Sequence, residues 1–142
     1  MPMRMKEGSG EHVLIVEDNA LVVGAIRLLL EESGFQVRAA GSVAEAVPLA
    51  RDFRPDVMLL DLSLPDGDGL VVLERLTSIA AAPRVTVALT GHDDVGTRDR
   101  CLNAGCRAVL IKPMSPLALP HQLSVWLSEI NEPRSGSATP PA

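Results

Sequence analysis

The segment Val57–Gly69, VMLLDLSLPDGDG, limits the fold of this chain more than any other stretch. Its first four residues are apolar, which fits a strand buried on both faces, and the acid Asp61 closes the run. A helix would also fit the run by periodicity, but Pro55 before it, and Pro65 with two glycines after it, favour a short strand and a turn. Because an unpaired buried carboxylate is costly, we expect Asp61 at the carboxyl end of the strand, where open α/β sheets bind ligands.

Length and composition indicate a single domain with an aliphatic core. The chain has 142 residues, of which 46% are hydrophobic and 2% aromatic, as is typical of helices layered on a parallel sheet. A net charge of −5 provides no basic surface, so direct binding to nucleic acid or anionic membranes is not expected. With no signal-peptide core or membrane-spanning run, a cytoplasmic location is expected. Cys101 and Cys106 lack further metal ligands and are expected to be inert packing thiols.

Short apolar runs alternate with helical patterns along the chain. We expect strands at 12–16, 36–40, 57–61, 84–89 and 108–111, and helices at 20–32, 42–54, 70–79, 93–104 and 115–130. Asn19 is expected to cap the first helix, and Ser42 with Glu45 resembles a capping box for the second. Pro48 predicts a kink or a later start of that second helix. Five strands alternating with five helices predict a doubly wound parallel α/β sheet with helices on both faces.

The two ends of the chain differ from its middle. Residues 1–10 and 131–142 are polar, and we expect them to be disordered tails around one domain at 11–130. In the last helix, which we expect Ser115-Pro116 to open, one set of apolar residues recurs at helical spacing. These residues, Leu123, Trp126, Leu127 and Ile130, are predicted core positions, with a homodimer face as the alternative for part of them.

Four of the predicted strands end in polar residues that packing does not require. These residues are Glu17, Asp18, Asp61, Thr90 and Lys112. Taken singly, all of them except Asp61 have an ordinary explanation as loop acids, a cap or a strand-end lysine. Right-handed βαβ connections, however, bring all of these strand ends to one edge of the sheet. Three carboxylates there would suit Mg²⁺, and Lys112 would leave room for a phosphoryl group that a carboxylate can accept as nucleophile.

Several motifs carry a family resemblance. VED at 16–18, DLSLPDGDG at 61–69, ALTG at 88–91 and AVLIKP at 108–113 occur in the order and at the intervals of response regulator receiver domains. The run from His12 to Ile130 resembles that family of two-component signalling proteins. The resemblance implies the flavodoxin-like strand order 2-1-3-4-5 and a phosphoacceptor signalling domain, not an enzyme, with at most self-catalysed phosphorylation and dephosphorylation. It also implies a sensor histidine kinase or phosphotransfer protein as partner and a downstream protein target that the sequence does not identify.

The resemblance also assigns roles to individual residues. Asp61 looks like the phosphoacceptor, with Thr90 and Lys112 contacting the phosphoryl group and a cis peptide joining Lys112 to Pro113, as in relatives. The implied Mg²⁺ ligands are the carboxylates of Asp18 and Asp61, that of Glu17 through water, and the backbone carbonyl of Ser63. Phosphorylation would then repack the surface around the fourth helix and the fifth strand.

The chain departs from the family pattern at one position. Relatives commonly carry Tyr or Phe three residues before the site lysine, where this chain has Val109, and it contains no Tyr. Signal transmission by an aromatic side-chain flip is therefore not expected to apply. Ser63 and His92, two residues beyond Asp61 and Thr90, resemble the variable positions that tune phosphoryl lifetime in the family.

Three other functions compete with a phosphorylated receiver. A phosphatase of the haloacid dehalogenase type also uses a nucleophilic Asp with Mg²⁺, but it places that Asp after the first strand with a second acid two residues on. Here Asp61 follows the third strand, and Ser63 stands at the second position. A degenerate receiver would bind a partner without phosphorylation, which the complete residue set disfavours. The chain could also be the receiver module of a hybrid histidine kinase instead of a stand-alone receiver.

Overall fold

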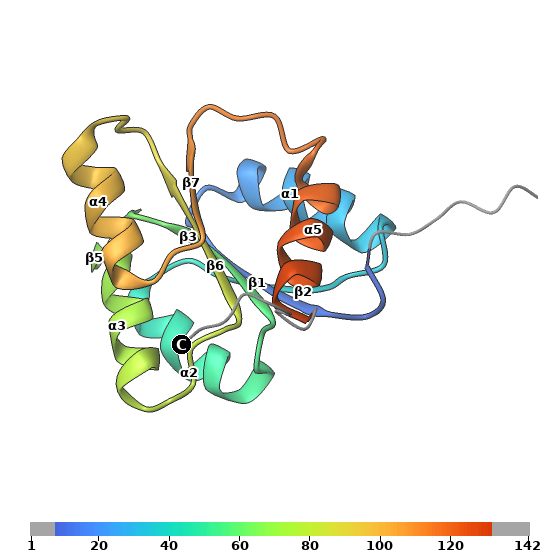
Figure 1. Ribbon diagram of the computed structural model, residues 1–142, viewed down its shortest axis with the longest axis horizontal. Coiled ribbons are helices and arrows are strands. Elements are labelled where there is room, and N and C mark those ends of the chain that lie inside the picture. Colours follow the sequence, from blue (N-terminus) through green and yellow to red (C-terminus); the bar gives the residue numbers. More distant parts are fainter. Residues whose placement is uncertain (1–7, 132–142) are drawn as a thin grey trace, which may run out of the picture.

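The computed structural model describes residues 8–131 and shows a parallel sheet with helices on both faces (Figure 1). The strands are β1 (His12–Val16), β2 (Gln36–Ala40), β3 (Val57–Asp61), β4 (Ser63–Leu64), β5 (Gly67–Asp68), β6 (Val85–Thr90) and β7 (Ala108–Ile111). The helices are α1 (Ala20–Glu32), α2 (Val43–Phe53), α3 (Leu70–Ser78), α4 (Val95–Ala104) and α5 (Leu119–Asn131). Among the described residues, no helix is long and apolar enough to cross a membrane.

The main sheet has the strand order β2-β1-β3-β6-β7, and every pairing in it is parallel. The predicted doubly wound sheet of order 2-1-3-4-5 is therefore confirmed. Helices α1 and α5 lie over one face, and α2, α3 and α4 lie over the other (Figure 1). Alternate residues of the central strands face opposite ways, so Leu60 packs under α2 and α3 while Leu59 packs under α1 and α5. All five residues of β3 are buried, as a central strand covered on both faces requires.

Local capping agrees with the sequence at two helix starts. The Asn19 side chain accepts hydrogen bonds from the backbone N–H groups of Leu21 and Val22 at the start of α1. Ser42 accepts from the backbone N–H of Glu45 at the start of α2. The Glu45 carboxylate accepts from the N–H of Gly41 and not from that of Ser42, so this box is displaced by one residue from the usual form.

One predicted helix start is wrong, and one predicted effect of a proline is absent. Helix α2 begins at Val43, directly after its predicted first residue Ser42, and continues past Pro48, so of the kink or late start expected from this proline the late start does not occur. Helix α5 begins at Leu119 and not at Ser115-Pro116, because the N–H of Leu119 bonds the carbonyl of Pro116 in a preceding turn. Pro120 then stands in the first helical turn, where a backbone N–H has no partner to lose.

The predicted tails lie mostly outside the described residues, which exclude 1–7 and 132–142. At 8–10, the N–H groups of Gly8 and Gly10 donate to the carbonyls of Ser33 and Gly34, at 2.8 and 2.9 Å. Helix α5 includes Asn131, the first residue of the predicted C-terminal tail. The extent of the domain at 11–130 and the disorder of its tails stay predictions.

The two cysteines pack beneath α4 as expected. Cys101 and Cys106 are free, buried and part of the cluster between the sheet and helices α2 to α4. Burial raises the pKa of the Cys106 thiol to about 12, and it also raises that of Cys101. Both thiols therefore stay protonated near neutral pH, which disfavours nucleophilic chemistry.

A short antiparallel hairpin follows the central strand where the sequence predicts only a turn. Strands β4 and β5 pair Ser63 with Asp68 and Leu64 with Gly67. Gly67 has φ of 143°, a conformation that residues with a Cβ rarely adopt. The hairpin returns the chain to the end of β3, where the N–H of Gly69 donates to the carbonyl of Leu62 at 2.9 Å.

Gly69 lies too close to β3 for any side chain. A Cβ at this position would overlap the carbonyl oxygen of Asp61 and lie 2.9 Å from its carbonyl carbon. These neighbours are backbone atoms of a buried strand and have little room to move. Gly24, on the exposed side of α1, is the opposite case, because nothing lies within 4 Å of a Cβ built there.

These two glycines predict opposite effects of the same substitution. We expect Gly69→Ala to lower the free energy of unfolding by about 1–3 kcal/mol, because the methyl group forces the strand end and the hairpin apart. Gly24→Ala should raise it by roughly 0.5–1 kcal/mol, because alanine is the better helix former. Urea denaturation of both variants checks this pair, and equal midpoints would contradict the close approach at Gly69.

Candidate functional site

Strand register brings the predicted site residues together at one edge of the sheet. Val16 of β1 pairs with Leu60 of β3, so Glu17 and Asp61 follow side by side. Asp61 is level with Leu89 of β6, and Thr90 is level with Ile111 of β7. The predicted convergence of these strand ends is therefore present in the fold.

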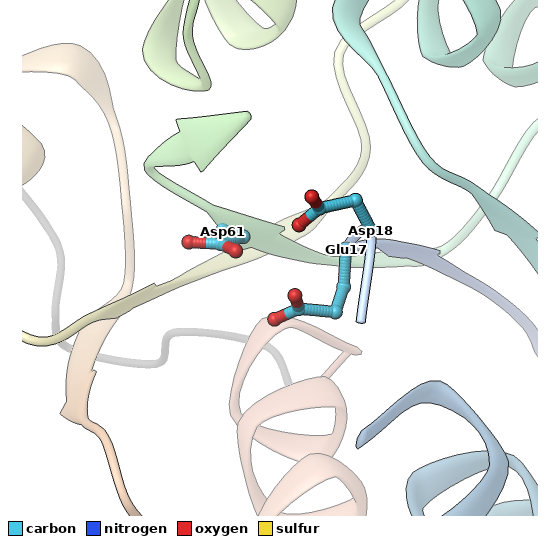
Figure 2. Close-up of side chains that lie close together, drawn as sticks. All are labelled: Glu17, Asp18 and Asp61. Atoms are coloured by element: carbon cyan, nitrogen blue, oxygen red, sulfur yellow. The ribbon is translucent and has the colours of Figure 1, made fainter. Parts of the chain in front are cut away.

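Three carboxylates form the centre of the site. Glu17, Asp18 and Asp61 each offer an oxygen atom, and these atoms lie within 4.8 Å of one another (Figure 2). Glu17 is 3% exposed and Asp61 2% exposed, whereas Asp18 is exposed to solvent. The cluster thus opens to water on the side of Asp18 and is closed by the sheet on the other.

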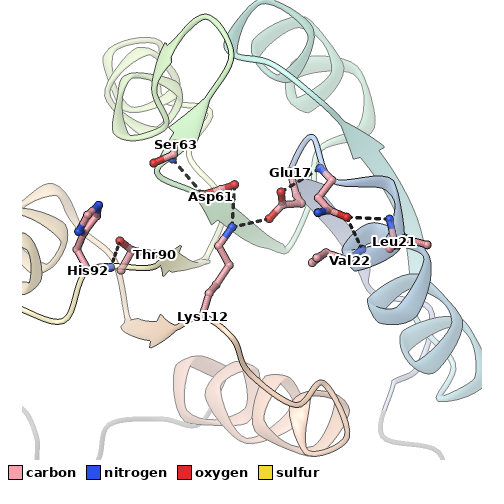
Figure 3. A network of polar contacts seen from close by, with 9 residues as sticks. Glu17, Leu21, Val22, Asp61, Ser63, Thr90, His92 and Lys112 are labelled. Atoms are coloured by element: carbon pink, nitrogen blue, oxygen red, sulfur yellow. Dashed lines mark hydrogen bonds and ion pairs between the residues drawn. The ribbon is translucent and has the colours of Figure 1, made fainter.

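Lys112 is the cation of the site. Its Nζ donates to Glu17 Oε1 and to Asp61 Oδ2, at 3.1 Å in each case (Figure 3). Burial by itself would lower the pKa of this ammonium, but its hydrogen bonds to the two carboxylates and the negative charges of these groups outweigh the effect of burial, so the pKa is raised. Lys112 is therefore protonated at any physiological pH. The peptide bond from Lys112 to Pro113 is cis, as predicted.

Glu17 is a buried carboxylate whose pKa is raised by its surroundings. Burial raises its pKa, and the charge of Asp61 adds to this, while the backbone N–H of Asn19 and the Lys112 ammonium act in the opposite direction. The Asn19 N–H lies 3.0 Å from Glu17 Oε2. The net direction is upward, so folding without a metal leaves an incompletely compensated charge at Glu17.

Both carboxylate oxygens of Asp61 accept hydrogen bonds, and its backbone is held in the sheet. The N–H of Ser63 donates to Asp61 Oδ1 at 3.0 Å, while Lys112 occupies Oδ2 (Figure 3). The N–H of Leu62 donates to the carbonyl of Leu89 at 3.0 Å, so the chain stays tied to β6 directly after Asp61. The nucleophile candidate is therefore oriented by a rigid strand and one turn amide.

Thr90 lies near the cluster but is not part of its network. Its side chain is buried, and Oγ1 accepts the N–H of His92 at 3.0 Å (Figure 3). No hydrogen bond links Thr90 to the three acids within residues 8–131. Val109 is half-buried on β7, level with Ala88 of β6, and packs against the cluster under α2 to α4.

The donor set fits a hard divalent cation. Three carboxylates face one ammonium, so with every acid ionised the cluster carries an excess of negative charge. Carboxylate oxygens are the ligands that Mg²⁺ prefers, and it retains several waters, which suits a site open to solvent. The pocket around the acids is open and is lined by Glu17, Asp18, Asn19, Val22, Asp61, Ser63, Lys112 and Pro113.

Some features of the site could not be foreseen from the sequence. The Asn19 side chain was predicted as a helix cap, but its backbone N–H also orients Glu17. The sequence DGDG indicates only a turn, so the close contact of Gly69 with the Asp61 carbonyl is not predicted from it. Neither role is visible without the path of the chain in space.

Comparison with known families gives one consistent result. A model of the response regulator receiver domain matches residues 13–124, which is most of the chain. The polar-differentiation response regulator DivK of Brucella anthropi is 38% identical over 104 residues, covering 72% of this chain and 85% of the relative. The DivK protein of Brucella ovis matches to the same extent.

Solved structures show the same fold. A CheY-like receiver domain protein from Methanospirillum hungatei superposes with a TM-score of 0.78 at 26% identity, covering 85% of this chain and 96% of its own. A two-component response regulator from Clostridium difficile gives 0.79 at 23% identity, covering 86% and 99%. At 23% identity, the second likeness concerns the fold alone.

The raised pKa of Glu17 predicts a pH-dependent gain from removing its charge. Because the pKa of Glu17 is raised on folding, the folded state favours its neutral form. This form contributes to stability in full below the ordinary pKa of 4.5, and the contribution is lost as the pH rises through the raised pKa of the folded state. Without Mg²⁺ at pH 7, Glu17→Gln should therefore have a higher urea midpoint than the wild type, and the difference should vanish at acid pH. Added Mg²⁺ should stabilise the wild type more than the variant, because the amide of Gln lacks the negative charge that attracts the cation. A variant less stable than the wild type at pH 7 without metal would contradict this account.

Proposed function

The chain belongs to the response regulator receiver domain family, and from this premise we propose that Asp61 accepts a phosphoryl group from a phosphohistidine of a partner protein. The partner would be a sensor histidine kinase or a phosphotransfer protein. One observation supports this most: the Asp61 carboxylate is held at an open pocket by Lys112 and the Ser63 amide, beside two further acids. Phosphorylation would then alter a protein-binding surface around α4 and β7.

The transfer needs no oxidant or further reactant. An oxygen of the Asp61 carboxylate attacks the phosphorus atom in line with the departing imidazole, forming a P–O bond as the P–N bond breaks. The electron pair of the P–N bond stays on the imidazole nitrogen, which takes up a proton from solvent. The product on this chain is an acyl phosphate at Asp61.

The residues of this chain would position the reactants and balance charge. The proposed metal ligands are the carboxylates of Asp18 and Asp61, the carboxylate of Glu17 through water, and the backbone carbonyl of Ser63. Bound Mg²⁺ would supply positive charge against the phosphoryl oxygens and the acids. Lys112 would remain protonated and exchange a carboxylate partner for a phosphoryl oxygen. The Thr90 hydroxyl, whose oxygen accepts the N–H of His92, would donate a hydrogen bond to another phosphoryl oxygen.

The same arrangement limits what the domain can catalyse. It is a signalling domain, and we propose that its chemistry extends only to its own phosphorylation and dephosphorylation. Asp61 ends the third strand of the sheet, and Ser63, two residues on, has no acidic side chain to serve as a general acid. A phosphatase with turnover on external esters would need such a group.

Phosphorylation by a small donor tests the proposed acceptor. Incubation with acetyl phosphate and Mg²⁺ should add the mass of one phosphoryl group to the wild type, and Asp61→Asn should remain unmodified because an amide oxygen is a poor nucleophile. Omission of Mg²⁺ should suppress the modification. Intact-mass spectrometry measures both effects.

A matched control separates loss of the acceptor from general damage. Asp56 lies just before β3, at the other end of the same strand, and accepts the N–H of His12 at 2.9 Å. Asp56→Asn keeps an acceptor for that amide and should be phosphorylated like the wild type. Equal labelling of Asp61→Asn and the wild type would overturn the proposal, as would rapid release of phosphate from a generic ester over many cycles.

A further inference from the structure

The β4–β5 hairpin is attached to α2 by one side chain at its turn. Asp66 stands between the two short strands and is exposed. Its Oδ1 accepts the N–H of Val43 at 2.8 Å, and its Oδ2 accepts the N–H of Ala44 at 3.0 Å. These are the first two amides of α2, which have no partner within the helix. The carboxylate of one loop thus closes the end of a helix 22 to 23 residues earlier in the chain.

Helix α2 does not depend on Asp66 alone for its cap. Ser42, its own N-cap residue, accepts the N–H of Glu45 at 3.1 Å. The two hydrogen bonds to the helix amides are the leading cause that lowers the pKa of Asp66, so the carboxylate stays ionised near neutral pH. Asp66 therefore adds a permanent link between the hairpin and α2 to a helix start that is already capped.

The other parts of the hairpin contact the phosphoacceptor residue directly. Ser63 begins β4 and donates its N–H to Asp61 Oδ1, and its partner in the hairpin is Asp68. Gly69 follows β5 and lies against the carbonyl of Asp61. The hairpin is thus held at its base by Asp61 and at its turn by Asp66. The buried Leu64 side chain and an exposed ion pair of Asp68 with Arg100 of α4 also contribute.

We propose that Asp66 is a positioning residue that holds the β4–β5 hairpin against α2 and thereby fixes the Ser63 amide and carbonyl beside Asp61. The inference rests on the proposed function, because the position of the Ser63 backbone matters for the binding of the metal and the phosphoryl group. Without Asp66 the hairpin retains its base contacts and the exposed ion pair of Asp68 with Arg100 of α4, at 2.6 Å, but its turn loses both hydrogen bonds to α2. Two-stranded hairpins of this size are marginal in water, so the Ser63 backbone becomes mobile while the sheet stays folded.

Three variants separate this role from simple helix capping. Asp66→Ala removes both bonds to α2, and Ser42→Ala removes a cap of the same helix that does not involve the hairpin. Asp66→Asn retains one acceptor oxygen and should therefore behave between Asp66→Ala and the wild type. The readouts are hydrogen exchange of the Ser63 amide in the metal-free protein, Mg²⁺ affinity by calorimetry, and the rate of phosphorylation by acetyl phosphate.

We expect Asp66→Ala to speed exchange at Ser63 and to weaken Mg²⁺ binding by about tenfold, the lower end of the effect of outer-shell partners. Ser42→Ala should leave both values close to the wild type despite its damaged helix start. Equal values for Asp66→Ala and Ser42→Ala, with the wild type phosphorylated normally, would overturn the positioning role alone. Failure of the wild type to accept a phosphoryl group would instead overturn the proposed function.

Discussion

The ion pair of Lys112 with Glu17 and Asp61 is the interaction on which the functional edge of this domain depends. Two carboxylates with almost no exposed surface lie at the ends of adjacent strands, and one ammonium bonds both at 3.1 Å. Removal of the Lys112 ammonium would leave two buried carboxylates without a compensating charge, which is strongly destabilising. The pair, however, leaves more negative than positive charge in the cluster. That remaining negative charge is what makes the site suited to a divalent cation.

The rigidity of the site has two sources with different strengths. The parallel sheet fixes Glu17, Asp61 and Lys112 through ladder hydrogen bonds and two buried clusters of side chains. The hairpin after β3 has only two residues in each strand, and it is fixed by its contacts at either end. Residues that hold such a loop next to a reacting group therefore affect metal binding and reactivity as well as the stability of the domain.

Much of the fold and of the site follows from local sequence patterns. The limits of β1, β2, β3, β7 and α1 agree with the apolar runs and with the Asn19 cap, because these signals act within a few residues. The start of α5 was predicted too early, because a Ser-Pro pair opens turns as readily as helices, and here the chain bends once more before Leu119. Of the kink or late start predicted from Pro48, the late start of α2 does not occur, because an apolar face that includes Val43 and Ala46 is buried against the sheet and outweighs the cost of the proline.

The sequence by itself determined which groups stand at the ends of the strands, and hence the chemistry available: three acids, a hydroxyl and one lysine. Only the tertiary structure decided which of them meet. Lys112 bonds to residues 95 and 51 positions earlier, and Asp66 reaches the amides of α2, while Thr90 turns to His92 and not to the acids. The physical reason is that strand ends are set by local propensity, whereas side-chain partners across a parallel sheet depend on register and on the packing of loops from distant parts of the chain.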